Sequence, residues 1–302
     1  MQQVTINNAY IRLTTLDYGA IIQEILVADK NGNPHNCAVG FEAAEDYKTD
    51  HRFLGACVGR FAGRISKGHF NIGNTSYPIY EHDGVHLHGG QKGFGRRFWK
   101  LLDHSDEKKP HVTYQYKSPH LEEGYPGNLI VTVTYQLLEN TLKILHQATT
   151  DLPTVVNLTN HTYFRLDNAA TQNEQILQIR SDKRLLTDEK LLPTGEIVSV
   201  ENTAFDFREP KKIGDLRLDT PYVVIPSEET LAVVHSPRSG IQLSVRSDQP
   251  ALVVFTPPDL PAICFETQNF PDAPNQPSFP SCLLLPGETY RNESFFTFHL
   301  VP

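Results

Sequence analysis

A run of polar side chains that begins at Glu266 is the strongest candidate for acid–base chemistry in this chain. The apolar residues 262–265 predict a short strand, and residues 266–269 read Glu-Thr-Gln-Asn directly after it. A carboxylate at the end of a rigid strand can act as a general base, and neighbouring amides can orient a polyhydroxyl ligand. A solvated strand end followed by a turn is the alternative, because Pro271-Asp272 comes next.

His161 lies in a second stretch that mixes polar and aromatic side chains. Asn157 and Asn160 precede the histidine, and Thr162 and Tyr163 follow it. An imidazole titrates near neutral pH, so it can donate a proton to an ether-like oxygen. A buried histidine with a purely structural role is the alternative for this residue.

His86 and His88 lie in a segment rich in glycine. Side chains alternate along a strand, so we expect the two imidazoles on one face, where such a pair can begin a metal site. A carboxylate or further histidine at an evident spacing is missing, and we predict that no metal binds. Hydrogen bonding to a polar ligand and a structural role both remain open.

Arg60 and Arg64 are four residues apart, so that one can face a cleft while the other makes a structural ion pair. A guanidinium group presents a rigid fork of donors that suits vicinal hydroxyls or carboxylates. A surface or ion-paired arginine is the alternative for each. Asp219 precedes the apolar segment 222–225, and its position indicates a turn residue.

The elements that must position these groups are short strands. Alternating or apolar segments predict strands at 10–16, 20–27, 129–135, 141–147, 241–245, 251–255 and 294–300. Gly73-Asn74 is a two-residue hairpin signal between two further short strands.

Helical signals are sparse. Residues 42–47 allow one or two helical turns, and 21 prolines and 19 glycines are spread along the chain. These features predict an all-β fold with very little helix, a large antiparallel β-sandwich that forms a single domain over residues 1–302.

The composition of the chain limits the classes of partner and the cellular location that we expect for the protein. The formal net charge is −8, which argues against nucleic acid as a partner, and no run of about 20 apolar residues predicts a membrane span. The first residues lack the pattern of a signal peptide. Cys37, Cys57, Cys264 and Cys282 are scattered, as is typical of reduced, buried thiols. We therefore predict a cytoplasmic protein.

Taken together, the motifs resemble those of the aldose 1-epimerases, the galactose mutarotase family. The matching segments, in the family's order, are 59–65, 86–90, 157–164, 205–208, 218–219, 266–269 and 285–290. Each motif alone is weak, but the ordered set covers nearly the whole chain and is highly specific.

The resemblance implies a β-sandwich of the galactose mutarotase type. It also implies an enzyme that interconverts the α and β anomers of a free hexose, such as galactose or glucose, without a cofactor. Glu266 matches the family's general base and His161 its general acid. Arg64, His88 and Asp219 match positions that bind sugar hydroxyls.

The chain departs from the family pattern at several positions. Gly63 and Val85 stand where asparagine is usual, Arg165 occupies another position that is commonly asparagine, and residues 255–258 replace a Tyr-Thr-Gly-Asn stretch. The proposed acid and base are unaffected, so these departures concern specificity. Neither the preferred aldose nor the oligomeric state follows from the sequence.

Two alternatives to a mutarotase remain. A non-catalytic carbohydrate-binding β-sandwich would retain the site, although a mere binder does not need both Glu266 and His161. A glycoside hydrolase would need two carboxylates, and Asp219 with Glu266 is the pair that the sequence offers. The mutarotase hypothesis predicts that His161 and Glu266 converge on one cleft.

Overall fold

Alternating burial defines the largest sheet. Along β12 (Leu129–Leu138) and β13 (Thr141–Thr150) every second side chain is buried, because successive side chains of a strand point to opposite faces.

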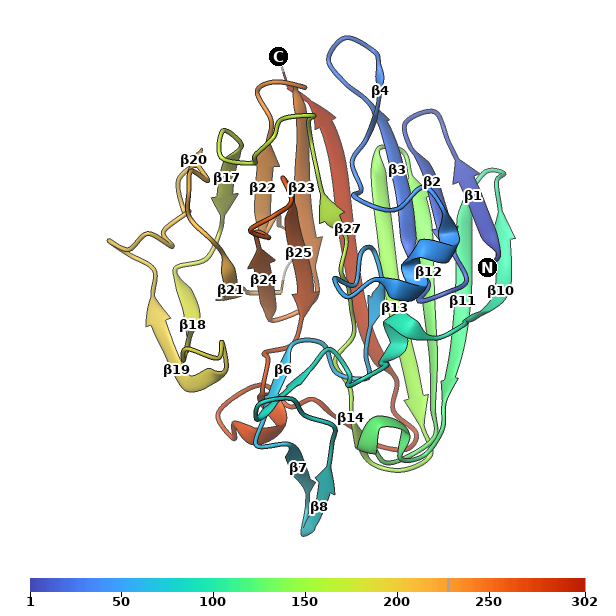
Figure 1. Ribbon diagram of the computed structural model, residues 1–302, viewed down its shortest axis with the longest axis vertical. Helices are drawn as coiled ribbons and strands as arrows, with labels where there is room; N and C mark the ends of the chain where they lie inside the picture. Colours follow the sequence, from blue (N-terminus) through green and yellow to red (C-terminus); the bar gives the residue numbers. More distant parts are fainter. Residues whose placement is uncertain (227–228, 302) are drawn as a thin grey trace.

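The structure, a computed structural model, describes residues 1–226 and 229–301. Its sheets pair antiparallel strands (Figure 1), which confirms the predicted all-β class.

Three sheets build most of the molecule. The nine-stranded sheet has the order β10 (Lys100–Ser105), β11 (His111–Ser118), β12, β13, β27 (Tyr290–Leu300), β23 (Ile241–Ser247), β22 (Ala232–His235), β17 (Ile176–Ile179), β20 (Lys211–Lys212). The six-stranded sheet has the order β16 (Tyr163–Phe164), β25 (Ile263–Gln268), β24 (Ala251–Phe255), β21 (Asp219–Val223), β18 (Lys183–Thr187), β19 (Pro193–Ser199). The four-stranded sheet consists of β1 (Gln3–Asn7), β2 (Arg12–Leu16), β3 (Ile22–Ala28) and β4 (Pro34–Asn36).

The other regular elements among the described residues are short two-stranded ladders and helical turns. The ladders are β5 (Cys57–Val58) with β15 (Thr159–Asn160), β6 (Arg64–Ser66) with β9 (Val85–Leu87), β7 (His69–Ile72) with β8 (Thr75–Pro78), and β14 (Thr154–Val155) with β26 (Leu283–Leu284). The helical turns are 3₁₀ segments at Ala44–Thr49, Phe94–Arg96, Glu122–Gly124 and Ala273–Asn275. The first of them overlaps the predicted turns at 42–47, and β7 and β8 form the predicted hairpin at Gly73-Asn74.

Side chains from the three large sheets share one core. Val131 of β12, Leu252 of β24 and Leu13 of β2 are fully buried in the same hydrophobic cluster. Burial of one such side chain contributes about 1.5–3 kcal/mol to folding. The sheets therefore cover one another's apolar faces, as the predicted sandwich requires.

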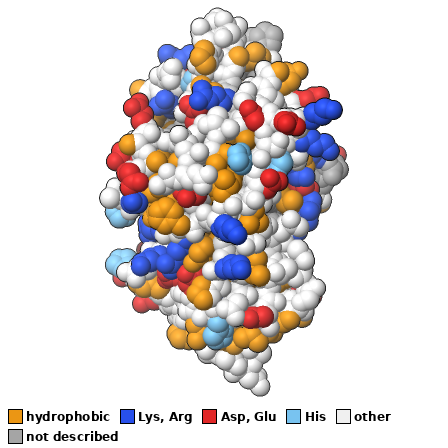
Figure 2. Space-filling view, turned by 90° about the vertical axis from the view of Figure 1, so that its right-hand side faces the viewer, with side chains coloured by type: hydrophobic (Ala, Val, Ile, Leu, Met, Phe, Trp, Pro, Cys, Tyr) orange, Lys and Arg blue, Asp and Glu red, His pale blue; other side chains and the backbone are white. Residues whose placement is uncertain are grey.

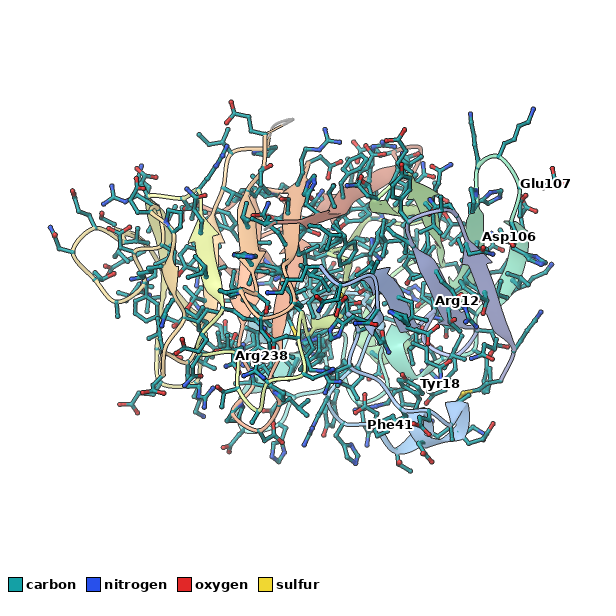
Figure 3. All side chains as sticks on the ribbon, turned by 90° about the horizontal axis from the view of Figure 1, so that it is seen from above. Arg12, Tyr18, Phe41, Asp106, Glu107 and Arg238 are labelled. Carbon is teal, nitrogen blue, oxygen red and sulfur yellow. The ribbon has the colours of Figure 1, made fainter. Side chains whose placement is uncertain are left out.

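The β10–β11 hairpin ties the nine-stranded sheet to the four-stranded one. Its turn carries Asp106, which lies beside the N-terminal strands (Figure 3). The Asp106 carboxylate accepts hydrogen bonds from the backbone N–H of Asn7 at 2.6 Å and from the Asn7 side-chain amide at 2.7 Å. The contact fixes the end of β1 against its neighbouring sheet.

The surface charges, the helices and the cysteines of the structure can be compared with the partners and the location predicted from the sequence. On the face drawn in Figure 2, basic and acidic side chains are interspersed. Among the described residues, no helix is both long and apolar enough to cross a membrane. The four cysteines are buried and unpaired, as predicted. The exclusion of nucleic acid and the cytoplasmic location stay predictions.

Arg60 is a buried structural residue. Its guanidinium donates hydrogen bonds to the carbonyl oxygens of Pro126 at 2.8 Å and Gly127 at 3.1 Å, and to the Ser118 hydroxyl at 2.5 Å. Burial lowers the pKa of Arg60 to about 10. One guanidinium thus satisfies the backbone acceptors of a buried loop, and this bonding differs from the ion pair expected for the structural arginine.

Replacing Arg60 should destabilise the fold. In Arg60→Met the loop carbonyls lose their donors inside the protein, and we expect the free energy of unfolding to fall by about 3 kcal/mol or more. Urea denaturation followed by circular dichroism measures the change. Arg12→Met, at a largely exposed side chain, is the control, and equal stability of the two variants would contradict this role.

Candidate active site

Strand β25 places Glu266 deep in the molecule. Ile263 and Phe265 point into the core shared by the sheets, so Glu266 lies on the opposite face of the strand. Its side chain is 4% exposed, and the residue pairs with Val253 of β24. The strand continues to Gln268. The sequence suggested that Glu266 lies at the end of the strand. It lies inside the strand instead, because the polar residues that follow it also pair with β24.

His161 is held by its backbone directly after β15. Its N–H donates to the carbonyl of Ala56 at 2.9 Å, and its carbonyl accepts from the N–H of Gly55 at 3.0 Å. The imidazole stacks on Tyr163 with 5.0 Å between ring centroids and meets His88 edge-on at 5.3 Å. Ring contacts on two sides leave it one orientation.

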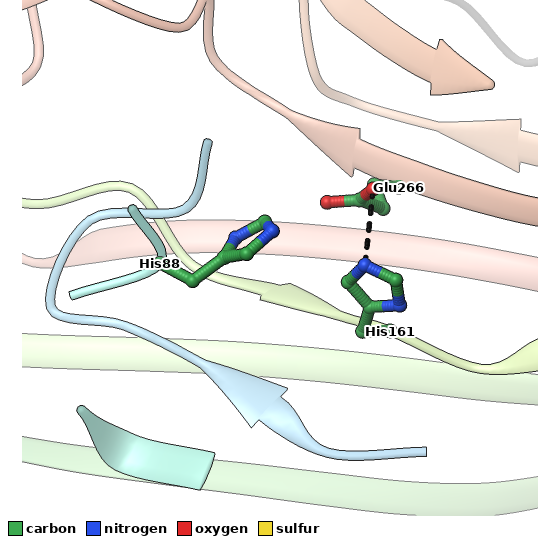
Figure 4. Close-up of side chains that lie close together, drawn as sticks. All are labelled: His88, His161 and Glu266. Carbon is green, nitrogen blue, oxygen red and sulfur yellow. Dashed lines mark ion pairs between the residues drawn. The ribbon is translucent and has the colours of Figure 1, made fainter. Parts of the chain in front are cut away.

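The two groups face each other across a short gap (Figure 4). Nε2 of His161 is 3.5 Å from Oε1 of Glu266, within reach of charge coupling but long for a hydrogen bond. Nδ1 of His161 and Oε2 of Glu266 are buried and have no hydrogen-bond partner among the described residues. The protein therefore leaves part of the hydrogen-bonding capacity of both groups unused.

An ion pair lies on the side of the site where the side chains are more exposed to solvent than His161 and Glu266. Arg64, the first residue of β6, donates from Nη2 to Oδ2 of Asp219 at 3.0 Å, and both side chains are partly exposed. Asp219 is the first residue of β21 and pairs with Phe255, so it belongs to a strand and not to the predicted turn. Strand β21 brings it to the site.

His88 is a neutral donor. The backbone N–H of Gly63 donates to its Nδ1 at 3.2 Å, so this nitrogen is unprotonated and the ring proton is on Nε2. Burial lowers the pKa of His88 well below its usual value, with a smaller contribution in the same direction from His161. The residue therefore carries an N–H for a ligand acceptor and no charge.

His86 and His88 do not share a face, contrary to expectation. Strand β9 ends at Leu87, and His88 has a φ of +50°, which turns its side chain out of the alternation. The Nε2 of His86 is 2.6 Å from the Tyr125 hydroxyl, and its Nδ1 is 2.6 Å from the carbonyl oxygen of Tyr80. His86 is therefore a satisfied structural histidine.

All five predicted site residues line one hollow of about 250 Å³. The further lining residues are His51, Arg52, Phe53, Gly63, Leu87, Tyr163, Leu191, Pro221, Val253, Phe255, Gln268 and Pro271. Phe53, which packs edge-on to His88 with ring centroids 5.0 Å apart, was missed by sequence reasoning and carries no motif that could have identified it. Gln268 is one of the amides beside Glu266 that the sequence led us to expect near a polyhydroxyl ligand, and it does line the hollow, two residues after Glu266 on the same strand.

Burial sets the ionisation of the central pair. Loss of solvation, with a smaller contribution from Asp219, raises the pKa of Glu266 to about 8. Loss of solvation lowers the pKa of His161 to about 4. Between these values the free site holds a neutral carboxylic acid and a neutral imidazole, that is, one exchangeable proton shared by two groups.

That proton can change place without a change in net charge. Transfer from Glu266 to His161 would produce a carboxylate and an imidazolium. Asp219 favours the charged form of His161, and Arg64 favours the charged form of Glu266. Asp219 also disfavours the charged form of Glu266, so the ion pair favours the imidazolium but has opposing effects on the carboxylate.

By distance alone, the site could also hold a metal ion. Donor atoms of His88, His161 and Glu266 all lie within 4.8 Å of one another. A histidine that binds a metal, however, almost always donates its second ring N–H to an acceptor. The second nitrogen of His88 accepts a hydrogen bond instead, and its Nε2 carries the proton. This tautomer disfavours a resident metal.

The sequence is similar to those of known proteins along nearly its whole length. A model of the aldose 1-epimerase family matches residues 2–297. The chain belongs to the aldose 1-epimerase family. The galactose mutarotase of Homo sapiens is 35% identical over 99% of this chain and 94% of its own length. The aldose 1-epimerase of Escherichia coli (strain K12) is 31% identical over 97% of this chain and 93% of its own length.

Solved structures of the family share this fold. An aldose epimerase homologue from C. elegans matches with a TM-score of 0.95 and 30% identity, over 100% of this chain and 99% of that one. A galactose 1-epimerase from Lactobacillus acidophilus NCFM matches with a TM-score of 0.88 and 29% identity, over 99% of this chain and 95% of that one. The galactose mutarotase type of sandwich, expected from the motifs, is confirmed.

The protein should not need a metal ion. A ligand that binds only the folded state raises the melting temperature, so melting temperatures measured with EDTA and with added Zn²⁺ should agree. Differential scanning fluorimetry measures both. A zinc-dependent rise that disappears in His88→Gln would contradict the assignment of the His88 tautomer.

Proposed function

We propose that this protein is a cofactor-independent aldose 1-epimerase that interconverts the α and β anomers of a free hexose such as galactose or glucose. The observation that carries the proposal is the buried His161–Glu266 pair, 3.5 Å apart and free of other side-chain bonds. Its hollow of about 250 Å³ lies below the usual range for drug-sized ligands, which suits one monosaccharide. Membership of the family supports the same reaction.

The reaction needs one proton acceptor and one donor. Glu266 takes the proton of the C1 hydroxyl while His161 gives a proton to the ring oxygen, and the bond between C1 and the ring oxygen breaks. The product is the open-chain aldehyde, in which C1 rotates about the C1–C2 bond. Ring closure on the other face of the carbonyl returns both protons, so the enzyme ends in its starting state.

The shared proton suits this cycle. Ring opening uses the form with carboxylate and imidazolium, and leaves the carboxylic acid and the neutral imidazole. Those are the two forms that differ only in the position of one proton. A site that moves between them needs no proton from solvent during a turnover, which matters because both groups are almost completely buried.

The remaining predicted residues bind the sugar. His88 offers its Nε2–H to a hydroxyl oxygen, since Nδ1 is already occupied by Gly63. Arg64 and Asp219 are joined through one nitrogen and one oxygen. The other donors and the second carboxylate oxygen can therefore bind sugar hydroxyls.

Loss of either central group should abolish most of the activity. Glu266→Gln keeps the shape of the side chain but removes the base, and His161→Asn replaces the imidazole by a shorter polar group that cannot act as the acid; each should lower kcat about 100- to 10,000-fold. Polarimetry of freshly dissolved α-galactose and α-glucose measures the rate above the spontaneous one.

Glu174→Gln, at a highly exposed side chain, is the matched control and should retain the rate of the unaltered protein. Near-normal rates in both site variants would reject the assigned roles. Absence of acceleration by the unaltered protein over several aldoses would reject the enzyme and leave a sugar-binding protein.

The pH profile should be a broad bell. Below about pH 4 both groups are protonated and the base is lost; above about pH 8 both are deprotonated and the acid is lost. Between the two values kcat/KM should change little, since the pair keeps its single proton. Polarimetric rates from about pH 3 to pH 10, corrected for spontaneous mutarotation, test the shape. A rate that still rises above pH 9 would contradict it.

A further inference from the structure

Gln268 is an unsatisfied amide in the wall of the hollow. Its side chain is fully buried, and it lines the same hollow as Glu266 and His161. Neither its Oε1 nor its Nε2 has a hydrogen-bond partner among the described residues. A buried polar group without a partner costs about 1–3 kcal/mol of stability. Such a cost calls for a compensating role.

Neighbouring buried amides are satisfied. The side chain of Asn157 donates to the carbonyl oxygens of Ala62 and Asn269 at 3.0 and 3.2 Å. The side chain of Asn292 donates to those of Leu158 and Thr267, both at 2.8 Å. The same region of the fold thus supplies partners to amides with a structural role. Gln268 differs from them because its amide has no partner among the described residues and because the residue lines the hollow.

Strand geometry gives Gln268 its direction. It lies two residues after Glu266 on β25, so both side chains leave the same face of the strand. Their Cα atoms are separated by about 6.8 Å at the usual rise of a strand. An amide at that distance from the base reaches another part of a bound sugar than the anomeric carbon.

Gly63 leaves room for this amide. A Cβ at position 63 would lie 3.1 Å from Nε2 of Gln268 and 3.1 Å from Pro271, and the backbone there has a φ of +79°. The family resemblance places an asparagine at this position. With glycine, no side chain at position 63 competes with Gln268 for the same hydroxyl.

We propose that Gln268 is a substrate-binding residue whose amide binds a ring hydroxyl of the aldose other than the anomeric one. The amide carries two N–H donors and one carbonyl acceptor, and a sugar hydroxyl both donates and accepts. The bound sugar would supply the partners that the folded protein lacks. This assignment rests on the proposed function, because it takes the hollow as the sugar site.

A shape-conserving variant separates binding from a structural role. Gln268→Met keeps an unbranched side chain of similar length but removes both polar atoms. We expect KM to rise about 2- to 10-fold, the effect of one neutral hydrogen bond, while kcat changes little. The melting temperature of the free protein should stay equal or rise, because an unsatisfied buried amide has been removed.

Gln249→Met is the matched control. Gln249 is also a buried glutamine, but its amide donates to Asp248 at 2.7 Å and to the carbonyl of Arg291 at 3.1 Å. Its replacement should lower the melting temperature and leave KM unchanged. The two glutamines thus predict opposite patterns in the same two measurements.

Deoxy sugars identify the hydroxyl. Mutarotation rates of the 2-, 3- and 4-deoxy derivatives of galactose, which each lack one ring hydroxyl, are measured with the unaltered protein and with Gln268→Met. For the hydroxyl that Gln268 binds, the losses in kcat/KM from the deoxy sugar and from the variant should be clearly less than additive. Gln268→Leu repeats the cycle if the methionine variant folds poorly.

Additive losses for every hydroxyl, or an unchanged KM with a lower melting temperature, would overturn the assignment. Both results leave the proposed function intact, since the unaltered protein still accelerates mutarotation. Absence of acceleration by the unaltered protein would instead reject the proposed function itself.

Discussion

The close approach of an imidazole to a carboxyl group, both almost completely buried, is the constraint on which the site depends. His161 and Glu266 lie 3.5 Å apart, and burial disfavours the charged form of each. Asp219 favours the charged form of His161 but also raises the pKa of Glu266, whereas Arg64 lowers the pKa of Glu266. Both of these side chains remain partly in contact with solvent. The balance between burial and these two charges determines where the single proton lies.

This arrangement needs several sheets to meet at one place. Glu266 and Asp219 come from the six-stranded sheet, Arg64 comes from the short β6–β9 ladder, and His161 directly follows the β5–β15 ladder. Their Cα positions are fixed by the shared hydrophobic core and by local backbone bonds, such as those of His161 to Ala56 and Gly55. Because no loop alone carries the central pair, its separation is set by the packing of rigid elements. The geometry required for proton transfer is thereby present before a ligand arrives.

Much of the fold and the site could be predicted from the sequence, because the residues that do chemistry occur in ordered motifs and the strands alternate. The strand ends could not. The sequence placed Glu266 after its strand and Asp219 in a turn, whereas pairing with neighbouring strands extends β25 and includes Asp219 in β21. The separation of His86 from His88 depends on one residue with a positive φ, which no periodicity reveals. The ionisation of Glu266 and His161 depends on burial by residues remote in sequence. Phe53 likewise reaches the site only because the fold packs it against His88, which is remote in sequence.

The position of β27 has a consequence for the synthesis of the protein. This strand, Tyr290–Leu300, lies between β13 and β23 in the middle of the nine-stranded sheet (Figure 1). Until it leaves the ribosome, β13 and β23 each present an unpaired edge, and the two halves of the sheet have no common ladder. Such edges invite association with other chains. A nascent chain therefore stays open to such association at these two edges until β27 has been added between them.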